Sequence, residues 1–258
     1  MVDALVLSGG AMEKERFRGF DPAIARKAQI PILGRPMVEW TVRGLRSCPQ
    51  IGRIIVVGDQ SLDTPALREL DATVIPERGD ISENLRAGLQ ALPDARRVLV
   101  LSGDLPLLTR AALEDLFGNA PEADVVFPYV ERADVLRDFP NRAWIFAPTP
   151  EGAFTGCSAA LVRPDVLRDR WLWVEELLNA RRRKPWQLAM MFGFSFTLKL
   201  CLRRLRVADV EQKLSSLLHL VGRGYRTRFN ELALDVDKYS DIMLVERVLQ
   251  QRERVGSS

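Results

Sequence analysis

Histidine and cysteine are scarce in this chain. Its 258 residues include one histidine, His219, and three cysteines, Cys48, Cys157 and Cys201. A single imidazole excludes zinc centres built from several histidines, iron sites with two histidines and the H-E-x-x-H protease motif. Three scattered cysteines provide neither a disulfide framework nor a C-x-x-C metal or redox motif. The chemistry must therefore rest on carboxylates, basic residues, hydroxyl groups and backbone amides.

Long apolar segments and a strong net charge are also missing. The longest apolar stretch, residues 188–198, has eleven residues, well short of the ~20 that cross a bilayer. The N-terminus enters a short apolar run without a basic segment or a cleavage site, so we expect a soluble cytoplasmic protein. The net charge of +3 does not by itself indicate a nucleic-acid partner. Hydrophobic residues at 47% and charged residues at 28% are typical of globular proteins.

The first half of the chain alternates short apolar runs with helical periodicity. Helix start signals separate the runs: Pro36, the pair Asp80 and Glu83 in capping-box spacing, and Thr109. This alternation predicts an α/β fold, a three-layer α/β/α Rossmann-like arrangement with a mixed, mainly parallel sheet. The predicted strands are 4–7, 54–57, 73–75, 98–101, 124–129, 143–146, 159–162, 225–228 and 232–236.

Residues from about 165 to 221 differ from the rest, because they are mostly helical in pattern and basic. The stretch 163–206 has eleven basic and four acidic residues, a local charge of +7 against −4 for the remainder. We predict one domain over residues 1–258 that contains this helical insertion. The basic run at 181–184 and nearby aromatic residues leave a membrane-surface role for 181–206 as an alternative. A solvated face, core packing or a homodimer surface is preferred.

Three features follow predicted strands, where open α/β sheets bind ligands. Leu7, Ser8, Gly9 and Gly10 form a turn whose paired glycines let backbone amides approach a phosphate. Asp104 follows a buried strand, where a carboxylate is costly without a partner such as a divalent cation. The alternatives are an ordinary glycine turn and an Asx-turn that ends the strand.

Asp235 and Asp237 are the third feature. Their alternation predicts that both lie on one face of a strand, and the alternative is a strand end that caps the following helix. Together, a glycine turn and separated carboxylates at strand ends predict a Mg²⁺–triphosphate site that needs no histidine.

The segments that carry these features occur in a recognisable order. They read "ALVLSGG", "KAQIPILGRPMVEWTVRGL", "GDISENLRAGLQAL", "VLVLSGDLPLLT" and "LDVDKYSDIMLVERVL". This series resembles the molybdenum cofactor guanylyltransferase-like (MobA-like) nucleotidyltransferases, which share a glycosyltransferase-A-like fold. The resemblance covers roughly residues 3–165 and 222–250. It implies a Mg²⁺-dependent enzyme that moves a nucleoside monophosphate from an NTP to a phosphorylated or hydroxyl acceptor and releases pyrophosphate.

The resemblance also implies a role for each matching residue. Catalysis would depend on Lys27, which neutralises triphosphate charge, and on the two metal ligands Asp104 and Asp237. Asp235 would support these two ligands without binding the metal ion itself, or it would hold a second metal ion. The residues that would bind the nucleotide are Leu7, Ser8, Gly9, Gly10, Lys27, Gly79, Ser82 and Asn84. Those that would bind the small-molecule acceptor are Thr155, Gly156 and Ser158.

One departure from the family pattern follows the paired glycines. Family members have a compact arginine-containing loop there, with the lysine soon after. This chain has "AMEKERFRGFDPAIAR" before Lys27, and Arg16, Arg18 and Arg26 are all candidates for the loop arginine.

Two other functions fit the same motifs. A glycosyltransferase with a nucleotide-sugar donor would use similar aspartates, although the context of Lys27 favours an NTP. A non-catalytic nucleotide-binding or membrane-surface module would instead use the basic helices. We expect His219 to be a helix cap and Cys157 to be a small packed side chain without a catalytic role.

Overall fold

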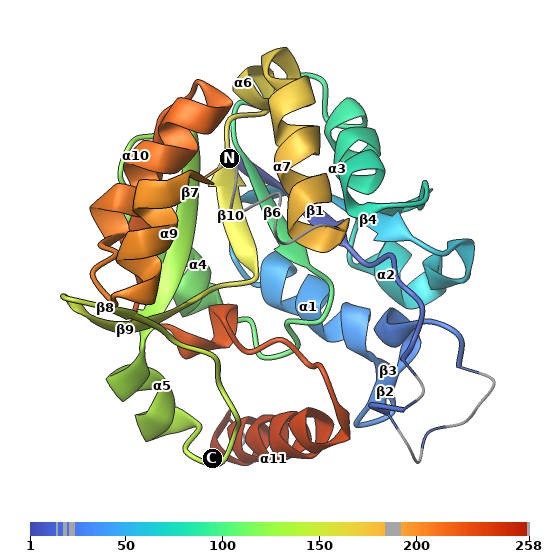
Figure 1. Cartoon of the computed structure of the whole chain (residues 1–258). Helices are drawn as coiled ribbons and strands as arrows, with labels where there is room; N and C mark the ends of the chain where they lie inside the picture. Colours follow the sequence, from blue (N-terminus) through green and yellow to red (C-terminus); the bar gives the residue numbers. More distant parts are fainter. Residues whose placement is uncertain (14, 18–19, 21–23, 184–191, 257–258) are drawn as a thin grey trace.

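A central β-sheet with helices on both faces forms the body of the protein (Figure 1). The computed structural model describes residues 1–13, 15–17, 20, 24–183 and 192–256. Nine strands within these residues form the sheet, in the order β5-β4-β1-β6-β10-β7-β9-β8, with β11 beside β7. Their bounds are β1 Val2–Leu7, β4 Ile51–Gly58, β5 Ala72–Pro76, β6 Val98–Ser102, β7 Val125–Glu131, β8 Ala147–Thr149, β9 Gly152–Gly156, β10 Ala159–Val162 and β11 Gly222–Arg226. A separate two-stranded sheet joins β2 (Pro31–Ile32) to β3 (Arg35–Pro36).

The sheet is mixed and mainly parallel, as predicted. Strand β1 pairs in parallel with β4 and β6, and β4 pairs in parallel with β5. Strand β10 is antiparallel to both of its neighbours, β6 and β7. Because β1, β4 and β6 run in one direction, their carboxyl ends meet at one edge of the sheet.

Helices cover both faces of the sheet. The α-helices are α1 Met37–Arg46, α2 Pro65–Glu69, α3 Ile81–Gln90, α4 Arg110–Asn119, α5 Arg132–Asp138, α6 Pro164–Asp169, α7 Trp171–Arg183, α9 Phe194–Cys201, α10 Val207–Leu218 and α11 Tyr239–Gly256. Alternating residues of β1 divide the core: Ala4 and Val6 join α1 and α4, whereas Leu5 joins α3, α6 and α7. The predicted start signals are confirmed at Pro36, Thr109 and the capping box of Asp80.

Two predicted strands are wrong. Residues 143–146 precede β8 as irregular chain, in which Trp144 stacks with Phe146 while Ile145 is exposed. Residues 232–236 begin in the 3₁₀-helix η3 (Asn230–Leu232) and continue as a turn and irregular chain without strand pairing. The apolar residues of this second segment are buried in core clusters, so a strand-like pattern arose without a strand.

The insertion contains α6, α7, α9 and α10 among the described residues. Residues 184–191 and the side chains of 180–183 lie outside them, so the basic run at 181–184 is not placed. His219 ends α10 in a left-handed conformation with φ 51°, as expected for a cap. No helix of the described residues is long and apolar enough to cross a membrane.

Gly88 in α3 and Gly118 in α4 provide a matched test of the packing on β1. A Cβ atom at Gly88 would overlap the buried side chain of Leu5, whereas one at Gly118 would meet nothing within 4 Å. We expect Gly88→Ala to lower the free energy of unfolding by about 1–3 kcal/mol through overpacking. Gly118→Ala should raise it by roughly 0.5–1 kcal/mol, because alanine favours helix. Urea denaturation measures both, and equal effects would contradict the described contact between α3 and β1.

Candidate active site

The turn after β1 lies between the ends of its two neighbouring strands. Ser8 donates its backbone N–H to the carbonyl of Val57 in β4 at 2.8 Å, and Gly103 donates to the carbonyl of Leu7 at 3.0 Å. A Cβ atom at Gly103 would clash with Ser8 Oγ, so glycine is needed where these two turns touch. Thr41 Oγ1 of α1 donates to the carbonyl of Gly103 at 3.1 Å. The turn of Leu7–Gly10 and the turn that presents Asp104 are therefore held together.

The loop before α3 forms the second wall of the site. A Cβ atom at Gly9 would lie 2.5 Å from Glu77 Oε2 and 2.8 Å from Asn84 Nδ2, which brings two predicted nucleotide-binding segments, 7–10 and 79–84, together. Gly79 has φ +82°, a left-handed conformation that favours glycine. Ser82 is fully buried and its hydroxyl donates to Asp80 at 2.6 Å, so its side chain is engaged in the helix cap.

One of the three candidate loop arginines lies in this site. Arg26 pairs with Glu77 at 2.6 Å and with Asp59 at 3.4 Å, beside the glycine turn. Arg16 pairs with Glu13 on the surface. Arg18 is outside the described residues.

Lys27 joins the two predicted metal ligands. It begins the 3₁₀-helix η1 (Lys27–Gln29), and its Nζ lies 2.5 Å from Asp104 Oδ2 and 3.0 Å from Asp237 Oδ1. Burial by itself lowers the pKa of Lys27, but attraction and hydrogen bonds from both aspartates outweigh it, so the pKa lies above its ordinary value. Lys27 is therefore a fixed positive charge at neutral pH.

A shared hydrophobic cluster positions this trio. Ile30 and Ile32 follow Lys27, Leu107 follows Asp104, and Val236 precedes Asp237, and all four apolar side chains belong to one buried cluster with α11. The backbone N–H of Val236 also donates to the carbonyl of Asp104 at 3.1 Å. Asp104 and Asp237 are thus held against Lys27, although they are 77 and 210 positions away from it in the sequence.

The carboxylates of Asp104 and Asp237 suit a magnesium ion bound together with phosphates. Asp104 Oδ1 is buried without a hydrogen-bond partner among the described residues, and so is Ser8 Oγ. The described residues hold no group of three or more His, Cys, Asp or Glu side chains that could hold a metal ion. Mg²⁺ commonly uses one or two carboxylates and completes its shell with substrate phosphates and water. Asp104 and Asp237 fit this pattern, because the Lys27 ammonium already shows that their carboxylates share one cation.

Residues 232–236 form no strand, so the prediction that Asp235 and Asp237 share a strand face is wrong. Its carboxylate accepts from Arg142 at 3.0 Å and from Ser158 Oγ at 3.2 Å. Burial and then repulsion from Asp104 and Asp237 raise the pKa of Asp235, against the lowering effect of Arg142. No motif in the sequence pointed to Arg142, which lies in the irregular segment before β8.

The predicted acceptor residues lie next to this group. Thr155 and Gly156 are in β9 and Ser158 directly precedes β10. Cys157 packs against the core, and burial, followed by repulsion from Asp235 and Glu231, raises the pKa of its thiol well above the usual range. A protonated, packed thiol agrees with the expected structural role.

Thr155 and Gly156 also border an apolar cavity of about 170 Å³. Its wall comes from β7, β8, β9 and the start of α10. The lining residues are Phe127, Tyr129, Ala147, Pro148, Thr149, Phe154, Thr155, Gly156, Leu205, Arg206, Val207 and Val210.

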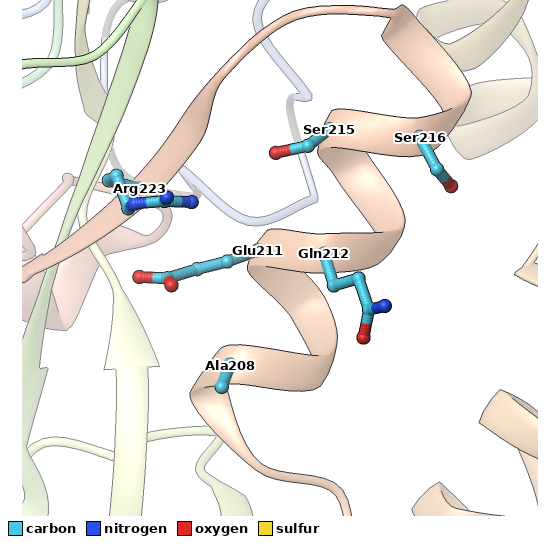
Figure 2. A pocket seen from close by; sticks show the side chains of 6 residues that line it. All are labelled: Ala208, Glu211, Gln212, Ser215, Ser216 and Arg223. Carbon is cyan, nitrogen blue, oxygen red and sulfur yellow. The ribbon is translucent and has the colours of Figure 1, made fainter.

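A larger hollow of about 680 Å³ lies on α10 (Figure 2) and contains no predicted site residue. Figure 2 shows Glu211 and Ser215 pointing to one side of the helix, and Gln212 and Ser216 to the other. Glu211 accepts from the N–H of Gly224 at 2.8 Å and Ser215 from that of Gly222 at 2.9 Å. These hydrogen bonds attach α10 to β11, so we assign Glu211 and Ser215 a structural role.

Comparisons with known proteins give consistent matches. Residues 4–219 match the MobA-like NTP transferase domain. Over 142 residues the chain is 29% identical to 2-C-methyl-D-erythritol 4-phosphate cytidylyltransferase of Synechococcus sp. (strain CC9902), a match that covers 49% of this chain and 63% of that relative. The chain thus spans less than two thirds of the curated relatives it matches.

Solved structures match over more than nine tenths of the chain. A hypothetical transferase from Thermus thermophilus is 34% identical with a TM-score of 0.81, covering 93% of this chain and 99% of that one. The 2-C-methyl-D-erythritol 4-phosphate cytidylyltransferase of Thermus thermophilus is 16% identical with a TM-score of 0.57, covering 96% and 98%. The second similarity shows the fold alone.

Proposed function

This chain belongs to the MobA-like NTP transferase family, and we propose that it transfers a nucleoside monophosphate from an NTP to a small acceptor with release of pyrophosphate. The observation that carries the proposal is the contact of Lys27 with both Asp104 and Asp237 beside the glycine turn. A lysine, two carboxylates and exposed backbone amides supply positioning and charge stabilisation, which such a transfer needs more than covalent chemistry.

Each group of the site has a proposed task. The backbone of Gly9 and Gly10 binds phosphates, Lys27 neutralises triphosphate charge, and Asp104 with Asp237 holds Mg²⁺. When bound, Mg²⁺ would neutralise phosphate charge and polarise phosphoryl oxygens. Lys27 would then exchange one of its carboxylate contacts for a phosphate oxygen.

A panel of ligands tests the proposal. The melting temperature is measured with ATP, CTP, GTP and UTP, each with Mg²⁺, and with UDP- and GDP-sugars. CTP is tested first because the curated relatives are named cytidylyltransferases.

We expect at least one NTP to stabilise the protein, since a ligand that binds only the native state raises the melting temperature. That NTP should then release pyrophosphate with a phosphorylated acceptor. Stabilisation by nucleotide sugars and by no NTP would favour a glycosyltransferase.

We propose that the apolar cavity receives an apolar part of the acceptor. Ser158, two residues beyond the cavity wall at Gly156, donates to Asp235 in the same segment as Asp237. An acceptor that extends from Asp237 along residues 156–158 would therefore reach the cavity, and apolar walls favour an apolar group.

Val207→Asp tests the cavity, with Ala208→Asp as its matched control in the same first turn of α10. Val207 lines the cavity, whereas Ala208 is exposed and does not. The acceptor is first identified by pyrophosphate release. We then expect Val207→Asp to raise the KM of the acceptor about tenfold, which corresponds to a loss of about 1.4 kcal/mol of binding free energy. The KM of the NTP should stay unchanged in both variants. Equal acceptor KM values in the two variants would refute a role for the cavity.

A further inference from the structure

We propose that Arg142 is a positioning residue that sets the affinity of the site for a divalent cation by clamping the turn that presents Asp237. This inference rests on the proposed function, because it assigns to Asp237 a cation to hold. The hydrogen bonds and ion pairs of Arg142 within the described residues do not include Lys27 or Asp104, so it would act through the turn.

The clamp joins both ends of the turn. Arg142 Nη2 donates to the carbonyl oxygen of Asp235 at 2.7 Å and to its carboxylate at 3.0 Å. Arg142 Nε donates to Asp241 Oδ1 at 3.3 Å. The side chain of Arg142 is 8% exposed and that of Asp241 is 2% exposed. One buried guanidinium therefore connects residues six positions apart, on either side of Asp237.

The clamped residues determine the backbone of Asp237. Asp241 Oδ2 accepts the backbone N–H of Asp237 at 3.0 Å. On the other side, the backbone N–H of Val236 donates to the carbonyl of Asp104 at 3.1 Å. The carboxylate of Asp237 is half-exposed, so its position depends on this backbone more than on surrounding side chains.

Arginine is suited to this task by its shape as well as its charge. Its planar group lies 4.2 Å from the ring centre of Trp144 while its edge donates to two carboxylates. A lysine ammonium has no planar fork and cannot reproduce this combination of stacking and directed hydrogen bonds. Without the guanidinium, Asp235 and Asp241 would repel each other, and Asp235 also repels Asp237.

The experiment measures cation binding directly, with Mn²⁺ as the probe. Free Mn²⁺ is quantified by electron paramagnetic resonance during titration, in the presence of the NTP that most raises the melting temperature. The variants are Arg142→Ala and Arg142→Lys. Arg168→Ala is the control, because Arg168 also donates to buried carbonyl groups, those of Leu89 and Leu92, but lies outside the site.

We expect Arg142→Ala to weaken Mn²⁺ binding about tenfold or more, as removal of groups that orient metal ligands does. Arg142→Lys should weaken it severalfold, even if its melting temperature stays near that of the wild type. Arg168→Ala should lower the melting temperature and leave the Mn²⁺ Kd within twofold. If Arg142→Ala does not fold, the Mn²⁺ Kd of Arg142→Lys decides whether Arg142 positions the cation site.

Two outcomes separate this inference from the proposed function. A folded Arg142 variant that binds Mn²⁺ within twofold of the wild type would overturn the positioning role while leaving the enzyme assignment intact. A wild-type protein that binds no Mn²⁺ with any of the four NTPs would overturn the proposed function itself, and with it this inference.

Discussion

Asp104→Asn is expected to lower the rate of Mg²⁺-dependent pyrophosphate release about 10²–10³-fold, the usual cost of removing one preorganised group that stabilises developing charge. The substitution keeps the shape of the side chain but removes the charge that Lys27 and the proposed Mg²⁺ share. The rate is measured with the acceptor and NTP that support turnover by the wild type.

Asp115→Asn is the matched control for Asp104→Asn. Asp115 is also a partly buried carboxylate; it accepts from Tyr225 and Thr227, each at 2.9 Å, and from Asn119 at 3.1 Å, and it lies in α4 outside the site. It should lose stability and keep the turnover rate. Both variants should retain cooperative unfolding. Equal turnover of Asp104→Asn and the wild type would remove Asp104 from the metal site.

Lys27→Met is expected to change two measurements in opposite directions. Pyrophosphate release should fall about 10²–10³-fold, because the triphosphate loses its fixed positive partner. Mn²⁺ binding without nucleotide should become about tenfold tighter, because the ammonium no longer competes for Asp104 and Asp237 at close range. Electron paramagnetic resonance of Mn²⁺ measures the second effect in the absence of NTP.

Lys199→Met is the control for Lys27→Met. Lys199 also forms an ion pair, with Asp209 at 2.6 Å, in the helical insertion. Neither turnover nor Mn²⁺ affinity should change in this variant. Weaker Mn²⁺ binding by Lys27→Met would show that the lysine supports the cation site instead of sharing its carboxylates.

The placement of the proposed site could be predicted from the sequence because parallel strands impose a simple geometry. Asp104 follows a buried strand and the Leu7–Gly10 turn follows its neighbour, so both had to meet at one edge of the sheet. The roles of Lys27 and Asp237 are implied by the family resemblance, and the side chain of Lys27 contacts both Asp104 and Asp237. The capping box of Asp80 likewise fixed the start of α3 from local chemistry alone.

The contacts of Arg142 with Asp235 and Asp241 could not be predicted from the sequence. Arg142 lies in an irregular segment and reaches carboxylates 93 and 99 positions away, a pairing that no periodicity encodes. Residues 232–236 have a strand-like pattern because their apolar side chains are buried in core clusters, although the segment pairs with no strand. Asp235 contacts Arg142 and Ser158, whereas Asp237 contacts Lys27.

The most direct test of the account is the Mg²⁺ dependence of NTP binding. Isothermal titration calorimetry would measure the Kd of the most stabilising NTP in Mg²⁺ and in EDTA, for the wild type and Asp104→Asn. We expect Mg²⁺ to tighten binding at least about tenfold in the wild type and to have little effect in Asp104→Asn. Equal affinities with and without Mg²⁺ in the wild type would contradict a metal–triphosphate site built on Lys27, Asp104 and Asp237.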